Sequence, residues 1–112
     1  MTNKKLQNLA NVWIKRLELE APVWRDISVS FGTEKELEGC LGYCTWDIDN
    51  SCAIIKIAKE PVQAENDVTV EEVLIHELLH LRLEGHRDIK DKRDAQYERA
   101  LNTISRVLCQ VK

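Results

Sequence analysis

His76, Glu77 and His80 form an H-E-x-x-H segment, the residue pattern with the clearest chemical meaning in this sequence of 112 residues. On a helix, two histidines four residues apart lie on the same side, one turn apart, so both imidazoles can reach one metal ion. The glutamate beside them can take a proton from a water that the metal polarises. The segment therefore predicts a hydrolytic zinc site with His76 and His80 as ligands and Glu77 as the general base.

The stretch around this segment is expected to be a buried helix. Thr69 and Glu72 have the spacing of a capping box, which starts a helix near residue 69. The residues that follow are apolar on most of the helix circumference, and Gly85 fits a C-terminal stop. Burying two histidines and a glutamate there without partners would cost on the order of a few kcal/mol each. Metal binding is therefore favoured over the alternative, in which these are ordinary core histidines.

Glu98 is the expected third ligand, because catalytic zinc usually takes three protein ligands and leaves one position for water. Residues 92–108 have an apolar stripe at helical spacing, and Glu98 borders it. The 18 residues from His80 to Glu98 leave room for the first helix to end and for a second helix to pack back against it. Asn102, one turn after Glu98, is expected to hold a ligand imidazole by its second ring nitrogen.

Two other residues stay open as the third ligand. His86 would extend the segment to H-E-x-x-H-x5-H. On a continuing helix it would lie about 120° from the line midway between the first two histidines, so it could bind only after a sharp chain reversal. Its alternative role is that of a histidine at a helix C-terminus. Glu84 also points roughly toward the histidine stripe, one turn further along.

The rest of the chain predicts a small sheet that these helices cover. The N-terminal segment is expected to form an amphipathic helix that packs on this sheet. Its apolar face consists of Leu6, Leu9, Trp13 and Leu17. Residues 26–31 alternate between apolar and polar, as in a half-buried strand, and residues 42–48 and 52–58 flank a turn-forming cluster, as in a hairpin. We therefore expect a single α+β domain over residues 1–112, with a sheet of about three strands.

At the H-E-x-x-H segment and Glu98 the chain resembles the gluzincin metallopeptidases, in which a downstream helix carries a ligand glutamate. It is most similar to the very small minigluzincins, which are about as long and also carry a His-Glu-Leu-Leu-His segment. Asn102 stands where that group often has Asp. The resemblance implies a zincin-like fold. In such a fold an edge strand beside the active-site helix binds extended substrate by main-chain hydrogen bonds, and one arm of the hairpin at 42–58 would be this strand.

These observations together lead us to expect an endopeptidase-like zinc metallopeptidase with Zn²⁺ as cofactor and a peptide or protein as substrate. Metal-activated water would hydrolyse the peptide bond, with Glu77 as general base. One alternative is a regulatory phage-type protease that cleaves a specific partner such as a repressor. The other is a non-catalytic, zinc-stabilised binding protein, in which a fourth protein ligand such as His86 closes the metal site.

Composition and charge limit the kinds of partner and the cellular compartment that we expect for this protein. Hydrophobic residues make up 44% of the chain and charged residues 31%, as in a globular domain with a core. The net charge of −3 gives no electrostatic case for nucleic acid. Residues 6–17 are interrupted by polar side chains, so no secretion signal or membrane span is expected, and we expect a cytoplasmic protein. The four cysteines are then expected to be reduced thiols.

Overall fold

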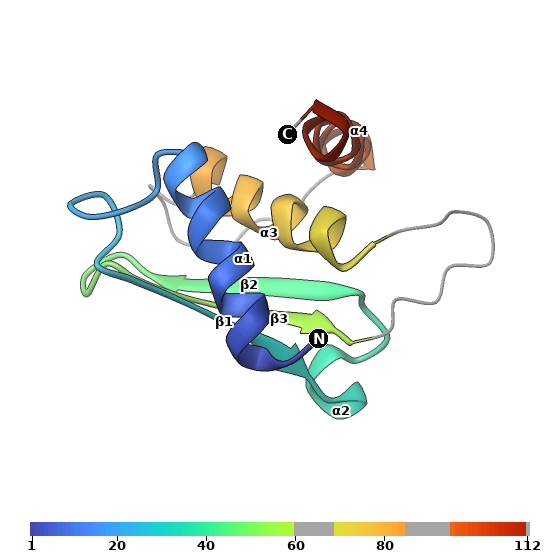
Figure 1. Ribbon diagram of the computed structural model, residues 1–112, viewed down its shortest axis with the longest axis horizontal. Helices are drawn as coiled ribbons and strands as arrows, with labels where there is room; N and C mark the ends of the chain where they lie inside the picture. Colours follow the sequence, from blue (N-terminus) through green and yellow to red (C-terminus); the bar gives the residue numbers. More distant parts are fainter. Residues whose placement is uncertain (60–68, 85–94, 112) are drawn as a thin grey trace.

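Residues 1–59, 69–84 and 95–111 are described by the computed structural model of the protein. Four helices and a three-stranded mixed sheet in these residues confirm the expected α+β class (Figure 1). The elements are α1 (Asn3–Arg16), β1 (Asp26–Gly32), α2 (Glu34–Leu37), β2 (Gly42–Asp47), β3 (Cys52–Ala58), α3 (Val70–Glu84) and α4 (Ala95–Val111). None of the helices in this part of the chain is both long and apolar enough for a membrane span.

The sheet has the strand order β1-β3-β2, so β1 and β2 are its two edges. β2 and β3 form the expected antiparallel hairpin, whereas β1 pairs with β3 in parallel. In the hairpin turn the Asp47 carboxylate accepts hydrogen bonds from the side chain and the backbone amide of Asn50, at 2.6 and 3.3 Å. These bonds hold the pKa of Asp47 below its usual value, because they favour the charged form.

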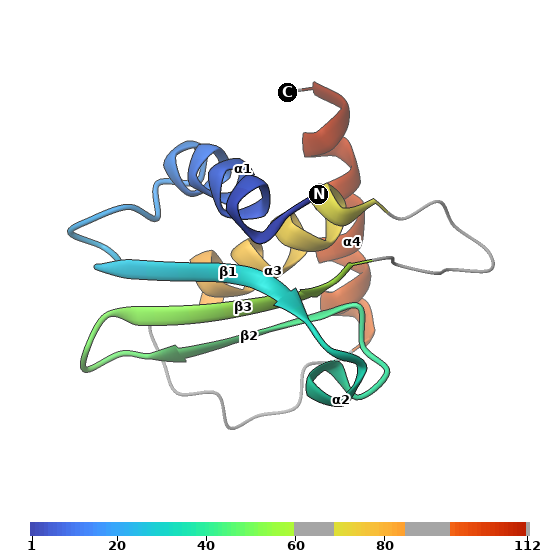
Figure 2. The ribbon, with the colours of Figure 1, turned by 60° about the horizontal axis from the view of Figure 1, so that its bottom comes forward.

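The helices α1 and α3 cover one face of the sheet, and α4 packs on α3 on the side away from the strands (Figures 1 and 2). Alternate residues of the strands point into this helical layer and are buried, as a half-covered sheet requires. At the centre of the core, side chains of α1, β3, α3 and α4 are almost completely inaccessible to solvent. They include Leu6, Ile55, Ile57, Leu74, Leu78 and Leu101.

α1 is joined to the rest of the domain by polar contacts as well as by its apolar face. The predicted residues Leu6 and Trp13 are buried, and Leu9 and Leu17 pack against the core. The indole nitrogen of Trp13 donates a hydrogen bond to the Glu71 carboxylate, 2.8 Å away, at the start of α3. The N-terminal helix is therefore fixed to the helix that carries the H-E-x-x-H segment.

The ends of the predicted helices differ from the structure in particular places. α3 begins at Val70 as expected, with the Thr69 hydroxyl accepting the Glu72 amide at 3.1 Å. The second helix continues to Val111, about one turn beyond the predicted end at 108, while residues 92–94 lie outside the described residues. The short α2 was not expected, although Thr33 and Glu36 form a complete capping box at its start.

Candidate metal centre

α3 and α4 bring His76, His80 and Glu98 together, as the sequence predicts. His76 Nε2 lies 2.9 Å from Glu98 Oε2, and His80 Nε2 lies 3.2 Å from Glu98 Oε1. The two imidazole Nε2 atoms are 3.1 Å apart. The three side chains come from two helices, so the packing of α4 on α3 determines whether the group forms.

The spacing of these atoms fits a single metal ion. In a tetrahedral zinc site with bonds of about 2.0–2.1 Å, neighbouring ligand atoms lie about 3.3 Å apart. The three contacts in this cluster are 2.9, 3.1 and 3.2 Å long, the first and the last of them to different oxygens of Glu98, and one candidate ligand atom from each residue lies within 4.8 Å of the others. Small side-chain adjustments would therefore place one ion within bonding distance of all three groups. The described residues thus contain a His-His-Glu group that could hold a metal.

The cluster is buried on one side and open on the other. The His80 side chain is 3% exposed, that of His76 is 15% exposed, and that of Glu98 is 36% exposed. His80 therefore forms the floor of the cluster, and Glu98 stands at its rim in contact with solvent. Among the described residues, the exposed side of the cluster is therefore the one that Glu98 forms.

Glu84 takes the role that the sequence analysis gave to Asn102. The Glu84 carboxylate lies 2.7 Å from Nδ1 of His80, whereas the other ring nitrogen, Nε2, faces His76 and Glu98. Asn102 lies on α4 and is exposed. Glu84 is thus a partner of a ligand and not a ligand itself in this arrangement. The spacing of four residues from His80 is the sequence signal that could have identified it.

Glu77, the expected general base, lies between the cluster and the edge strand β2. Its position on α3 is about 60° around the helix from His80, and it is 7% exposed. A Cβ atom added to Gly42, at the start of β2, would lie 3.4 Å from Glu77 Cγ and 2.9 Å from Val73 Cγ1. The backbone of β2 therefore approaches α3 closely beside Glu77, and a side chain at this position would not fit.

Two further residues of the sequence analysis have different outcomes. His86, the alternative third ligand, lies outside the described residues. Tyr97 precedes Glu98 on α4, and its ring centroid is 5.9 Å from that of His80. The tyrosine ring therefore lies beside that of His80. The four cysteines are thiols in the structure, and none of them belongs to the His-His-Glu group.

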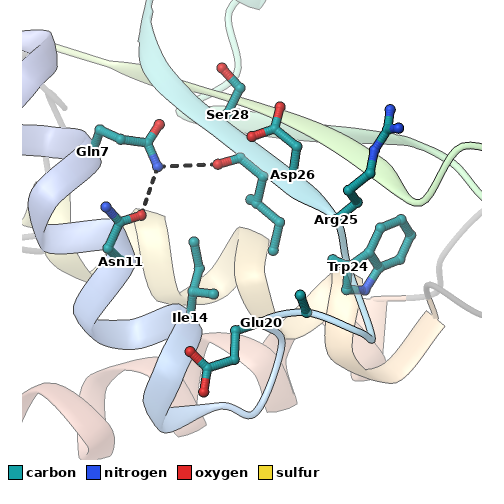
Figure 3. A pocket seen from close by; sticks show the side chains of 10 residues that line it. Gln7, Asn11, Ile14, Glu20, Trp24, Arg25, Asp26 and Ser28 are labelled. Atoms are coloured by element: carbon teal, nitrogen blue, oxygen red, sulfur yellow. Dashed lines mark hydrogen bonds between the residues drawn. The ribbon is translucent and has the colours of Figure 1, made fainter.

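A hollow of about 440 Å³ lies at the opposite edge of the sheet, between α1, the loop that follows it and β1 (Figure 3). Its lining includes two carboxylates, one guanidinium and two side-chain amides, with an apolar floor. The lining residues are Gln7, Asn11, Ile14, Glu20, Ala21, Trp24, Arg25, Asp26, Ile27 and Ser28. None of the residues of the His-His-Glu cluster lines this hollow, because the cluster lies on α3 and α4.

Comparisons with protein-family models, with curated proteins and with solved structures found no significant match to this chain. The functional argument therefore depends on the geometry of the cluster and on the residues around it.

Proposed function

We propose that this protein is a zinc-dependent metallopeptidase with a zincin-like fold of the gluzincin kind, in which His76, His80 and Glu98 hold the metal. The contact geometry of these three side chains is the observation that carries the proposal. Two imidazoles and a carboxylate are a donor set that zinc takes in hydrolytic sites. A bound zinc ion would supply a Lewis acid that lowers the pKa of a bound water toward about 7.

Glu77 is the residue that would move the proton. It adjoins both ligand histidines on α3, and its 7% exposure keeps bulk water from competing for its carboxylate. A carboxylate in this place can accept a proton from the attacking water and deliver it to the leaving amine. Tyr97 is a candidate for a second hydrogen-bond donor to the reacting carbonyl, because its ring lies near His80.

The edge strand β2 favours an extended peptide as the substrate. Its inner side pairs with β3, and no strand in the described residues pairs with its outer side. Main-chain groups on the outer side of an edge strand can pair with a peptide in extended conformation. Because α3 packs against β2 near Gly42 and Glu77, a peptide added to this edge would pass beside the general base and the metal.

The test is to combine zinc analysis with hydrolysis of a broad peptide library. We expect the purified protein to bind one zinc per chain and to cleave peptides, and a chelator to remove both properties. The variant Glu77→Gln should keep its zinc and lose about 10²–10⁴-fold in rate, because proton transfer is removed while the ligands stay. Glu72→Gln, the same change on the first turn of α3 and away from the cluster, should keep full activity.

Two results would contradict this proposal. A protein that takes up no zinc stoichiometrically has no metal site of this kind. An active Glu77→Gln variant would remove Glu77 from the mechanism. A coordination shell of four protein groups without water would instead support the zinc-stabilised binding protein, since such a site has no position for the nucleophile.

A further inference from the structure

Glu84 and His80 form the most enclosed polar pair in the described part of the metal centre. The two side chains are 11% and 3% exposed, and Glu84 Oε2 is 2.7 Å from His80 Nδ1. Glu84 is four residues after His80 on α3, so the pair meets along one face of a single helix. Because both residues are on the same rigid element, the contact needs no loop to hold it in place.

This contact determines which ring nitrogen of His80 is available to a metal. An ionised Glu84 accepts a hydrogen bond from the protonated Nδ1 of His80, and this pairing leaves Nε2 for a metal that would take the place of its contact with Glu98. In a neutral imidazole the other nitrogen, Nε2, then carries the lone pair. Nε2 is the nitrogen that faces His76 and Glu98, at 3.1 and 3.2 Å. The lone pair therefore points to the place where the three ligand groups meet.

The position of Glu84 carries a desolvation cost. Glu84 lies on α3 and is 8% exposed, and burying a carboxylate is unfavourable unless the group is paired. The contact with His80 gives the buried carboxylate a hydrogen-bonding partner.

We propose that Glu84 is a positioning residue of the metal centre, which fixes His80 as an Nε2 ligand and strengthens its bond to the metal. This inference rests on the function proposed above. A carboxylate behind a ligand histidine orients the ring and makes the ligating nitrogen more basic. Together, Glu84 and Glu98 also supply two negative charges, which balance the charge of one divalent cation held by two neutral imidazoles.

The experiment measures zinc affinity by competition with a chromophoric chelator in the full-length chain. Glu84→Ala should weaken zinc binding by about 10–100-fold, as expected when such a partner of a ligand histidine is lost. Glu84→Gln should recover part of this loss, because the amide oxygen still accepts the Nδ1 proton but carries no charge. Arg82→Ala, at an exposed position two residues earlier on α3, should bind zinc as the unchanged protein does.

A second measurement separates positioning from a merely structural role. In the absence of zinc, thermal unfolding of Glu84→Gln should occur at the same temperature as that of the unchanged protein or at a higher one, since an unfavourable buried charge is gone. Lower stability together with unchanged zinc affinity in this variant would overturn the inference.

The two proposals fail in different ways. Failure of the unchanged protein to bind zinc would contradict the proposed function itself, whereas zinc binding that is insensitive to Glu84 would contradict this inference alone.

Discussion

The two edges of the sheet differ in how their backbone groups are used. At the β1 edge, the Gln7 side chain accepts a hydrogen bond from the Val29 amide at 2.7 Å. It also donates one to the Ile27 carbonyl at 3.1 Å, which is drawn in Figure 3. Asn3 accepts the Phe31 amide further along, at 2.8 Å. At the β2 edge, by contrast, the strand lies against α3 near Glu77 and Val73, and no described strand pairs with its outer side.

This difference shows that the protein closes one edge with side chains where another protein would use a strand. The primary amide of Gln7 makes the same pair of bonds to β1 that the N–H and the C=O of one residue in a neighbouring parallel strand would make. An edge that is satisfied in this way cannot add another chain. Under the proposed function, an extended substrate is therefore directed to β2, the edge that lies beside Glu77.

The largest effect is expected from Gly42→Ala, which places a methyl group between β2 and α3. The new Cβ would lie 2.9 Å from Val73 Cγ1 and 3.1 Å from the Lys56 carbonyl oxygen, so the strand or the helix must move. We expect the free energy of unfolding to fall by about 1–3 kcal/mol. The rate of hydrolysis should fall by about 10²-fold with zinc retained, because Glu77 shifts relative to the substrate. Chemical denaturation and the peptide assay measure the two effects.

Gly32→Ala on β1 is the matched control for this variant. A Cβ atom there would meet side-chain atoms of Leu37 and Lys56 at 3.1–3.3 Å, and the short α2 that carries Leu37 can move aside. We expect a smaller loss of stability and full activity. Adding Val73→Ala to Gly42→Ala removes the closest atom and should restore part of the activity. Equal activity losses in the two glycine variants would mean that the edges do not differ as described.

A smaller effect is expected from Gln7→Leu, which keeps the size of the side chain and removes its amide. The Val29 amide and the Ile27 carbonyl then lose their partners at a partly buried edge, which should cost about 1–3 kcal/mol of stability. The opened edge should also make the protein self-associate, as sedimentation velocity would detect. Hydrolysis per folded molecule should stay unchanged, because the metal cluster lies at the other side of the sheet.

Asn11→Leu is the control for Gln7→Leu. Asn11 accepts a hydrogen bond from the Gln7 side chain at 3.1 Å but makes no bond to β1 in the described structure. The control variant should therefore stay monomeric under conditions in which Gln7→Leu associates. Association of both variants to the same extent would show that the added apolar surface is responsible and that the edge hydrogen bonds are not.

The same contrast explains how much could be predicted from the sequence. α3 and the hairpin were predictable because their signals are local: apolar periodicity, a capping threonine and a turn cluster. Glu98 was predicted to lie near the histidines because a second helix that packs back on α3 brings few other metal-binding side chains toward them. In the structure its carboxylate lies 2.9 Å from His76. Local helix signals and a chain reversal were therefore enough to predict that His76, His80 and Glu98 lie together.

The contacts that were missed depend on distant pairing or on a choice between similar residues. Gln7 and Asn3 look like solvated helix residues, and their bonds to β1 span 20 to 28 positions, which leave no periodic pattern in the sequence. The parallel pairing of β1 with β3 is equally non-local. Glu84 was considered only as a third ligand, although its spacing of four residues from His80 on the same helix also suits a partner of that ring, and its carboxylate lies 2.7 Å from His80 Nδ1.

The smallest effect is expected from Asn3→Ala at the start of α1. The lost hydrogen bond to the Phe31 amide is exposed, and alanine favours the helix, so stability should fall by only about 0.5–1 kcal/mol. Hydrogen exchange should locate the change: the Phe31 amide should exchange faster, while the Val29 amide, held by Gln7, should keep its protection. Asn8→Ala, at an exposed position on the same helix, should change neither amide. Unchanged protection of Phe31 in Asn3→Ala would mean that the asparagine does not close this end of the β1 edge.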